Sequence, residues 1–124
     1  MLALVVDDSR TARLKLCRAL ADKGYEVLEA ENGRDALEQL EGRSAPDVAL
    51  VDWNMPLMNG IEFVKEVRAD SRYDQMLVVM VTSETAGVKV ARALMAGANE
   101  YLMKPYTNAL LFEKLEFLGL GSTA

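Results

Sequence analysis

Short apolar segments of strand length alternate along this chain with amphipathic segments of helical length. The apolar segments cover residues 2–6, 25–30, 47–51, 76–81 and 99–103. Each is followed by a stretch in which apolar residues recur with helical spacing. This alternation indicates an α/β fold: an open, doubly wound, parallel sheet of five strands flanked by five helices.

Residues typical of helix ends divide these segments. The candidate caps are Asp8 or Ser9, Asn32 and Thr107 at the starts, and Gly24, Gly97 and Gly119 at the ends. The fourth helix is expected over residues 85–96, where the apolar side chains include Ala91, Leu94 and Met95.

The chain has 124 residues, which suits one domain. It shows no internal repeat and no linker. We therefore expect a single domain over residues 1–119 and a short C-terminal tail over residues 120–124.

Composition excludes several classes of function. The net charge is −5 and there is no run of basic residues, so direct binding to nucleic acid or to an anionic membrane is not expected. There is no histidine, which excludes a Ser-His triad and histidine metal ligands. The single cysteine, Cys17, cannot form a disulfide within the chain. No signal peptide or membrane-spanning run is recognisable, and we expect a cytoplasmic protein.

Polar residues gather where the predicted strands end. The first strand is followed by Asp7 and Asp8, and Asp52, Thr82 and Lys104 follow later strands. Any one of these alone is best explained as a helix cap or a solvated loop residue. Together they should meet, because ligands of open α/β sheets bind at the carboxyl ends of the strands.

Three carboxylates beside one lysine call for a cation. Only oxygen ligands are available, which selects Mg²⁺, with Mn²⁺ possible, over zinc. A metal, a carboxylate, a hydroxyl and an ammonium together suit phosphoryl transfer, in which an aspartate can itself be the nucleophile.

Five motifs resemble those of the receiver domain of two-component response regulators. They are VVDDS at residues 5–9, LVDWNMP at 50–56, MNG at 58–60, VTSE at 81–84 and YLMKP at 101–105. The resemblance covers about residues 2–118 and is greatest to the stand-alone chemotaxis regulators. It implies a flavodoxin-like fold with strand order 2-1-3-4-5.

The resemblance also implies a role for each acidic residue. Asp52 is the expected phosphoacceptor. Asp8 and Asp52 are expected to bind Mg²⁺ directly, with Asp7 acting mainly through water. The backbone carbonyl of Asn54 is the expected third protein ligand.

The phosphoryl group itself has its own expected partners. By resemblance, Lys104 pairs with Asp52 and then with the phosphoryl group, and the Thr82 hydroxyl donates to a phosphoryl oxygen. Backbone N–H groups of Trp53 and Ser83 complete the cradle. The Lys104–Pro105 bond is expected to be cis.

Further residues are implied in switching and in the lifetime of the phosphorylated state. Movement of Thr82 toward the phosphoryl group lets Tyr101 turn inward, which alters the face made by the fourth helix, fifth strand and fifth helix. Asn54 and Glu84 can orient an attacking water for self-dephosphorylation. Ser83 departs from the Ala or Gly usual in the family.

The expected donor is a histidine kinase acting in trans, with an exposed Leu14 as one docking contact. The expected target is a flagellar motor switch or another output protein. We expect a monomer, with dimerisation on phosphorylation left open. The alternatives within the family are a receiver excised from a larger regulator, a phosphorelay member and a phosphate sink. Remote alternatives are a Mg²⁺-dependent phosphohydrolase of the haloacid dehalogenase type and a flavodoxin-like electron carrier.

Overall fold

The computed structural model describes residues 1–83 and 87–120, and all five predicted strands are present in it. The strands are β1 (Leu2–Val6), β2 (Glu26–Ala30), β3 (Val48–Asp52), β4 (Leu77–Thr82) and β5 (Glu100–Met103). The helices are α1 (Arg10–Asp22), α2 (Gly33–Leu40), α3 (Gly60–Arg68), α4 (Gly87–Ala96) and α5 (Asn108–Phe117), and a single 3-10 turn covers Ser71–Tyr73.

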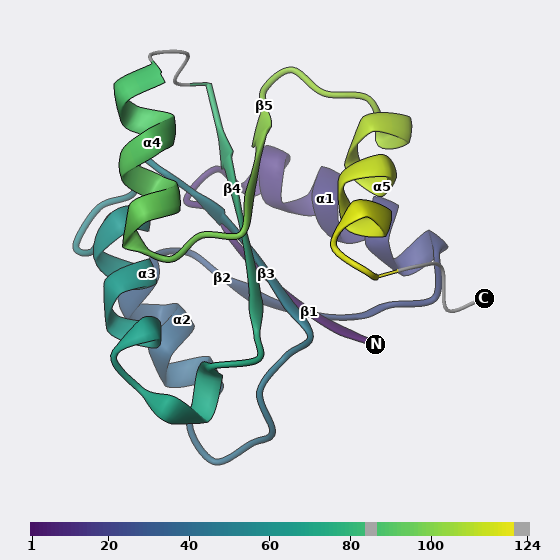
Figure 1. Cartoon of the computed structure of the whole chain (residues 1–124). Helices are drawn as coiled ribbons and strands as arrows, with labels where there is room; N and C mark the ends of the chain where they lie inside the picture. Colours follow the sequence, from purple (N-terminus) through teal and green to yellow (C-terminus); the bar gives the residue numbers. More distant parts are fainter. Residues whose placement is uncertain (84–86, 121–124) are drawn as a thin grey trace.

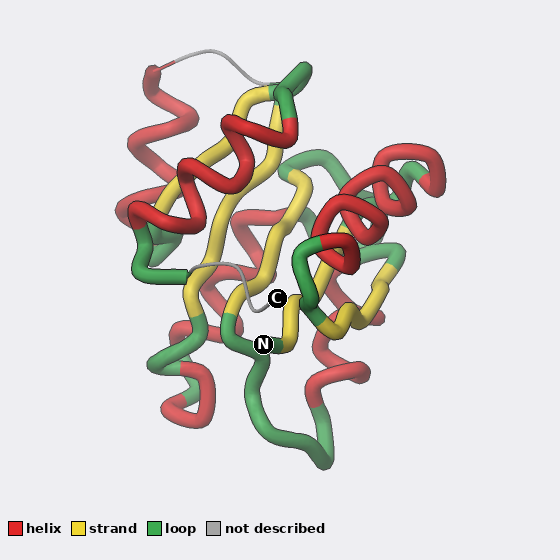
Figure 2. The backbone as a smooth tube through the Cα atoms, turned by 90° about the vertical axis from the view of Figure 1, so that its right-hand side faces the viewer, coloured by secondary structure: helices red, strands yellow, loops and turns green. Residues whose placement is uncertain are grey.

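The strands form one parallel sheet with the order β2-β1-β3-β4-β5. This confirms the predicted fold class and strand order. Figure 1 shows α1 and α5 on one side of the sheet and α2, α3 and α4 on the other. Figure 2 views the molecule from the side of α1 and α5. Because the strands are parallel, their carboxyl ends all lie at the same edge of the sheet, and β1 and β3 are neighbours within it.

Two apolar cores lie on the two faces of the sheet. One contains Leu16 and Leu20 of α1 with Leu111 and Leu115 of α5. The other, on the side of α2, α3 and α4, contains the fully buried Phe63. The central strands are buried on both faces, which explains why they read as continuous apolar runs.

Four helices begin at capping side chains. Ser9, Asn32, Asn59 and Thr107 each accept a hydrogen bond from the backbone N–H three residues later. Asn59 adds a reciprocal bond with Glu62, which makes a capping box. Three of these caps are those expected from the sequence.

Helix α4 differs from the pattern that its sequence suggests. Its apolar residues Ala91, Leu94 and Met95 are exposed, Met95 to 87%, whereas Ala93 is buried. The helix has apolar residues on more than one side, so periodicity does not decide which side meets the sheet. No helix of the described residues is long and apolar enough to cross a membrane.

Gly60 allows α3 to start directly against the backbone of β3. A Cβ atom at this position would lie 2.5 Å from the carbonyl oxygen of Asp52 and 3.1 Å from Cα of Trp53. Backbone atoms cannot move aside as a flexible side chain can. Gly60 therefore holds the start of α3 close to the end of β3.

We expect Gly60→Ala to lower the free energy of unfolding by about 3 kcal/mol, because the new methyl group must displace the backbone. Gly42→Ala is the matched control: it has a positive φ of 73° and nothing within 4 Å, so about 1 kcal/mol of strain is expected. Urea unfolding of both variants measures the difference. Equal losses would contradict the steric explanation.

Candidate functional site

Three carboxylates converge at the carboxyl ends of β1 and β3. Asp7 and Asp8 directly follow β1, and Asp52 is the last residue of β3. One oxygen from each carboxylate lies within 4.8 Å of the others. Asp7 is only 5% exposed, Asp52 is partly buried and Asp8 is exposed. The structure thus brings together the three residues that the sequence singled out as metal ligands.

Lys104 provides a positive charge within this acidic cluster. Its Nζ lies 3.0 Å from Oδ2 of Asp7 and 3.7 Å from Oδ1 of Asp52. Its backbone N–H donates a 2.8 Å hydrogen bond to the carbonyl of Thr82, which ties the lysine to the end of β4. The Lys104–Pro105 bond is cis, as expected. The sequence predicted a pair with Asp52, and the closer partner here is Asp7.

The surroundings of Asp52 raise the pKa of its carboxyl group. Burial raises the pKa of its carboxyl from 3.8 to about 6, and the charge of Asp7 adds to the rise. The opposing charge of Lys104 and a backbone hydrogen bond from Trp53 lower the pKa but do not cancel these effects. The ionised form of Asp52 is therefore unfavourable in the metal-free site, and a bound cation would stabilise it.

The donor set fits a hard divalent cation. The clustered ligands are carboxylate oxygens, and Lys104 alone does not compensate the three negative charges. Oxygen-only coordination is what Mg²⁺ and Mn²⁺ prefer.

The other predicted residues surround this cluster. Thr82, at the end of β4, is buried, and Trp53 packs into the core on the side of α3. Asn54 and Ser83 are exposed beside the ends of β3 and β4. Tyr101 is partly buried and packs against the same core as Trp53. Glu84 lies outside the described residues.

Sequence reasoning missed one residue beside the cluster, Arg13. Its Nη1 donates a 2.8 Å hydrogen bond to the backbone carbonyl of Asp7. An arginine in the first turn of a helix carries no local signal of such a contact, because the contact depends on how the helix packs over the strand.

Comparison with known families identifies the family of the chain that carries this site. The family model described as the response regulator receiver domain matches residues 3–116. The chain belongs to this family. The match confirms the resemblance seen in the motifs and removes the phosphohydrolase and flavodoxin alternatives. Receiver domains of this type are signalling proteins and not classical enzymes.

Individual relatives show which type of receiver domain this chain resembles. The chain is 48% identical over 117 residues to the chemotaxis protein CheY1 of Helicobacter pylori, covering 94% of each chain. It is 48% identical over 124 residues to the CheY homologue of Campylobacter jejuni, covering 98% of this chain and 95% of that protein. The solved structure of the chemotaxis protein CheY4 of Vibrio cholerae superposes with a TM-score of 0.88 at 39% identity, covering 94% and 96%. The receiver domain is thus of the CheY type, consistent with a phosphorylation-activated switch.

The raised pKa of Asp52 has a consequence for stability. In the unfolded chain this carboxyl has its ordinary pKa of 3.8, and in the folded metal-free protein about 6. The folded state therefore binds the proton more tightly, and the ionised group destabilises the fold increasingly as the pH rises through this window.

We expect Asp52→Asn to stabilise the metal-free receiver domain by about 1 kcal/mol near pH 7, because burial and the charge of Asp7 both disfavour an ionised carboxylate and the amide carries no charge. The gain should disappear below about pH 4, where the wild-type carboxyl is protonated in both states. Thermal unfolding across pH, in the presence of a chelator, measures it. A gain that is independent of pH would contradict the electrostatic cause.

Proposed function

We propose that this receiver domain, over residues 1–119 with a tail over 120–124, is a cytoplasmic signalling switch. It accepts a phosphoryl group on Asp52 from a histidine kinase in trans and passes the signal to a partner through α4, β5 and α5. The observation that carries the proposal is the convergence of Asp7, Asp8 and Lys104 on Asp52.

Asp52 supplies the nucleophile. A carboxylate oxygen attacks the phosphorus of the donor, and the bond from phosphorus to the donor's imidazole nitrogen breaks. The imidazole leaves with the electron pair, and an acyl phosphate remains on Asp52. We expect small donors such as acetyl phosphate to replace the kinase, so that the domain can phosphorylate itself.

The neighbouring residues stabilise the charge that develops. Asp8, Asp52 and the backbone carbonyl of Asn54 would hold Mg²⁺, with Asp7 acting mainly through water. The ion would offset the negative charge of the carboxylates and of the phosphoryl oxygens. Lys104 exchanges its contact with Asp52 for one with the phosphoryl group.

Hydrogen-bond donors around Asp52 complete the proposed phosphoryl site. The Thr82 hydroxyl and the backbone N–H groups of Trp53 and Ser83 donate to phosphoryl oxygens. Asn54, which is exposed two residues after Asp52, is proposed to orient a water for self-dephosphorylation.

Switching is proposed to run from Thr82 to Tyr101. Thr82 ends β4 and Tyr101 lies in the neighbouring strand β5. Movement of the buried Thr82 toward the phosphoryl group frees space into which the partly buried Tyr101 can turn. Phosphorylation then shifts the population between two packings of this region.

The proposed output face carries apolar side chains that the domain itself leaves exposed. They include Leu94 on α4 and Leu110 and Phe117 on α5, with Phe117 80% exposed. Beside them, Lys114 lies over the Tyr101 ring at 5.0 Å and pairs with Glu100 at 3.3 Å. A change at Tyr101 would therefore alter the charges of this face directly.

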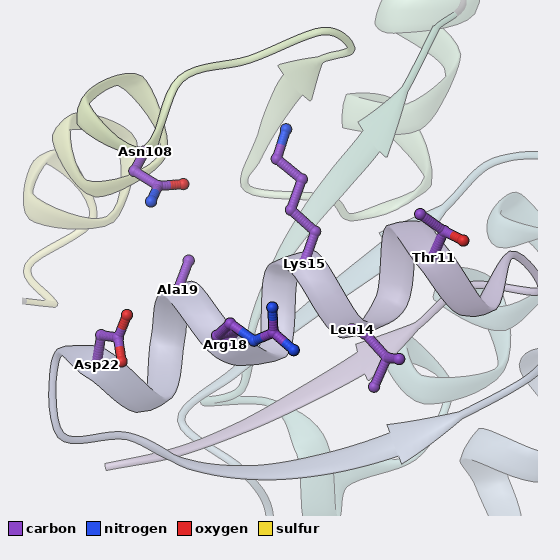
Figure 3. Close-up of a pocket in the computed structure, with 7 residues that line it drawn as sticks. All are labelled: Thr11, Leu14, Lys15, Arg18, Ala19, Asp22 and Asn108. Carbon is purple, nitrogen blue, oxygen red and sulfur yellow. The ribbon is translucent and has the colours of Figure 1, made fainter.

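Kinase docking is proposed for the exposed side of α1. Leu14 is exposed there and lines a groove of about 530 Å³ between α1 and the start of α5. Figure 3 shows Lys15 extending from α1 toward the segment before α5, and its Nζ lies 4.7 Å from the centre of the Tyr106 ring. The groove thus adjoins the segment that carries Lys104.

The relatives reported above are named chemotaxis proteins, which supports a flagellar motor switch as the target. The switch is proposed to be a monomer. A phosphorelay member, a phosphate sink or the receiver part of a larger regulator uses the same chemistry at Asp52.

We expect beryllofluoride, which mimics the phosphoryl group, to increase recovery of the partner at least about tenfold in a pull-down. Asp52→Ala should recover equal, low amounts with and without the mimic. Recovery of a motor protein identifies the output as chemotactic. Identical recovery by the wild-type domain in both states would refute the switch.

A further inference from the structure

The side chain of Arg13 joins α1 to the ends of β1 and β2 beside the acidic cluster. Its Nη1 donates a 2.8 Å hydrogen bond to the backbone carbonyl of Asp7. Its Nε donates a 3.0 Å hydrogen bond to Oε1 of Glu29 in β2. The side chain is only 12% exposed. Because two different nitrogens of a planar group are engaged, the orientation of the guanidinium is set.

These contacts complete the hydrogen bonding of Asp7. Its backbone N–H donates to the carbonyl of Ala30 at 3.1 Å. Its Oδ1 accepts from the N–H of Ser9 at 2.9 Å, and its Oδ2 accepts from Lys104 at 3.0 Å. Arg13 binds the remaining polar atom, the carbonyl oxygen. Asp7 is thereby held at all four of its polar atoms.

The carbonyl of Asp7 belongs to the peptide unit that joins Asp7 to Asp8. That unit is planar, so a hydrogen bond to its oxygen sets the orientation of the whole plane. The plane in turn determines where the Cα of Asp8 lies and in which direction its side chain leaves the backbone. Asp8 is exposed and does not pack into a core that would position it otherwise.

We propose that Arg13 is a positioning residue of the metal site, which directs the Asp8 carboxylate toward Asp7 and Asp52 through the Asp7–Asp8 peptide. The inference rests on the proposed function, because it concerns the Mg²⁺ that this function requires. Arg13 acts by geometry and not by charge, since Glu29 pairs with its guanidinium. A lysine has a single ammonium and cannot make both contacts in the same plane.

The test is Mg²⁺ titration of Arg13→Met, followed by the fluorescence of Trp53, the only tryptophan, which adjoins Asp52. We expect the dissociation constant to rise about tenfold, as for removal of a residue that orients a metal ligand. Arg13→Lys should show a rise of about threefold. Arg18→Met is the matched control: it removes an exposed arginine from the same helix and should bind Mg²⁺ as the wild type does.

A second measurement separates positioning from a general loss of structure. The rate of phosphorylation by acetyl phosphate is measured against Mg²⁺ concentration, at a temperature where each variant is folded. The half-saturating Mg²⁺ concentration should rise in Arg13→Met, while the rate at saturating Mg²⁺ stays within about twofold of wild type. If Arg13→Met does not fold, Arg13→Lys decides by the same two measurements.

The outcomes distinguish this inference from the proposed function. If the wild-type domain shows no saturable response to Mg²⁺, the proposed function fails. If the wild type binds Mg²⁺ and the Arg13 variants bind it equally well, the positioning role is refuted and the function stands. A lower maximal rate with an unchanged half-saturating Mg²⁺ concentration also refutes it, because that pattern indicates structural damage.

Discussion

Asp52→Ala is expected to lower phosphoryl incorporation from acetyl phosphate by at least about a hundredfold. The variant lacks the carboxylate that forms the acyl phosphate. Asp7 cannot substitute for it, because its two oxygens are engaged by Ser9 and Lys104. Mass spectrometry of the intact protein, incubated with acetyl phosphate and Mg²⁺, measures the gain of one phosphoryl group.

Asp74→Asn is a suitable control for this experiment. Asp74 is exposed and follows the 3-10 turn before β4, outside the acidic cluster. The control should incorporate phosphate at the wild-type rate. If Asp52→Ala took up the label as readily as this control, Asp52 would not be the acceptor. If both variants lost the label, the cause would be a general effect of removing negative charge.

The fold could be predicted because its strands carry a simple signal. Strands β1, β3 and β4 are nearly continuous apolar runs, which is what burial on both faces requires. Such runs do not determine the order of the strands in the sheet. That order was predicted from the resemblance to the receiver domain family. The 3-10 turn over Ser71–Tyr73 was not predicted, since three residues are too few to show a periodicity.

The site was predictable to the extent that its residues directly follow strands. Asp7, Asp8 and Asp52 share this position, and parallel strands bring them to one edge. Details that depend on distance were not accessible. The preference of Lys104 for Asp7 over Asp52 is a difference between 3.0 and 3.7 Å. The contact of Arg13 with Asp7 depends on the exact position of α1 relative to β1. No local pattern of residues encodes how a helix is placed against a strand.

Mg²⁺ affinity is expected to fall about tenfold between pH 7 and pH 5. The cause is Asp52, whose pKa of about 6 in the metal-free protein makes the proton a competitor for the same carboxylate. Above this pKa the carboxylate is already ionised and the affinity should level off. Titration followed by Trp53 fluorescence at several pH values measures the dependence.

Asp52→Asn provides the control that assigns this pH dependence to one residue. The amide cannot ionise, so the variant should bind Mg²⁺ more weakly at pH 7 but with little change between pH 7 and pH 5. The two affinities should therefore converge as the pH falls, because protonated Asp52 and asparagine are both neutral ligands. If the variant lost affinity as steeply as the wild type, the proton would be binding elsewhere in the cluster. The raised pKa of Asp52 would then play no part in metal binding.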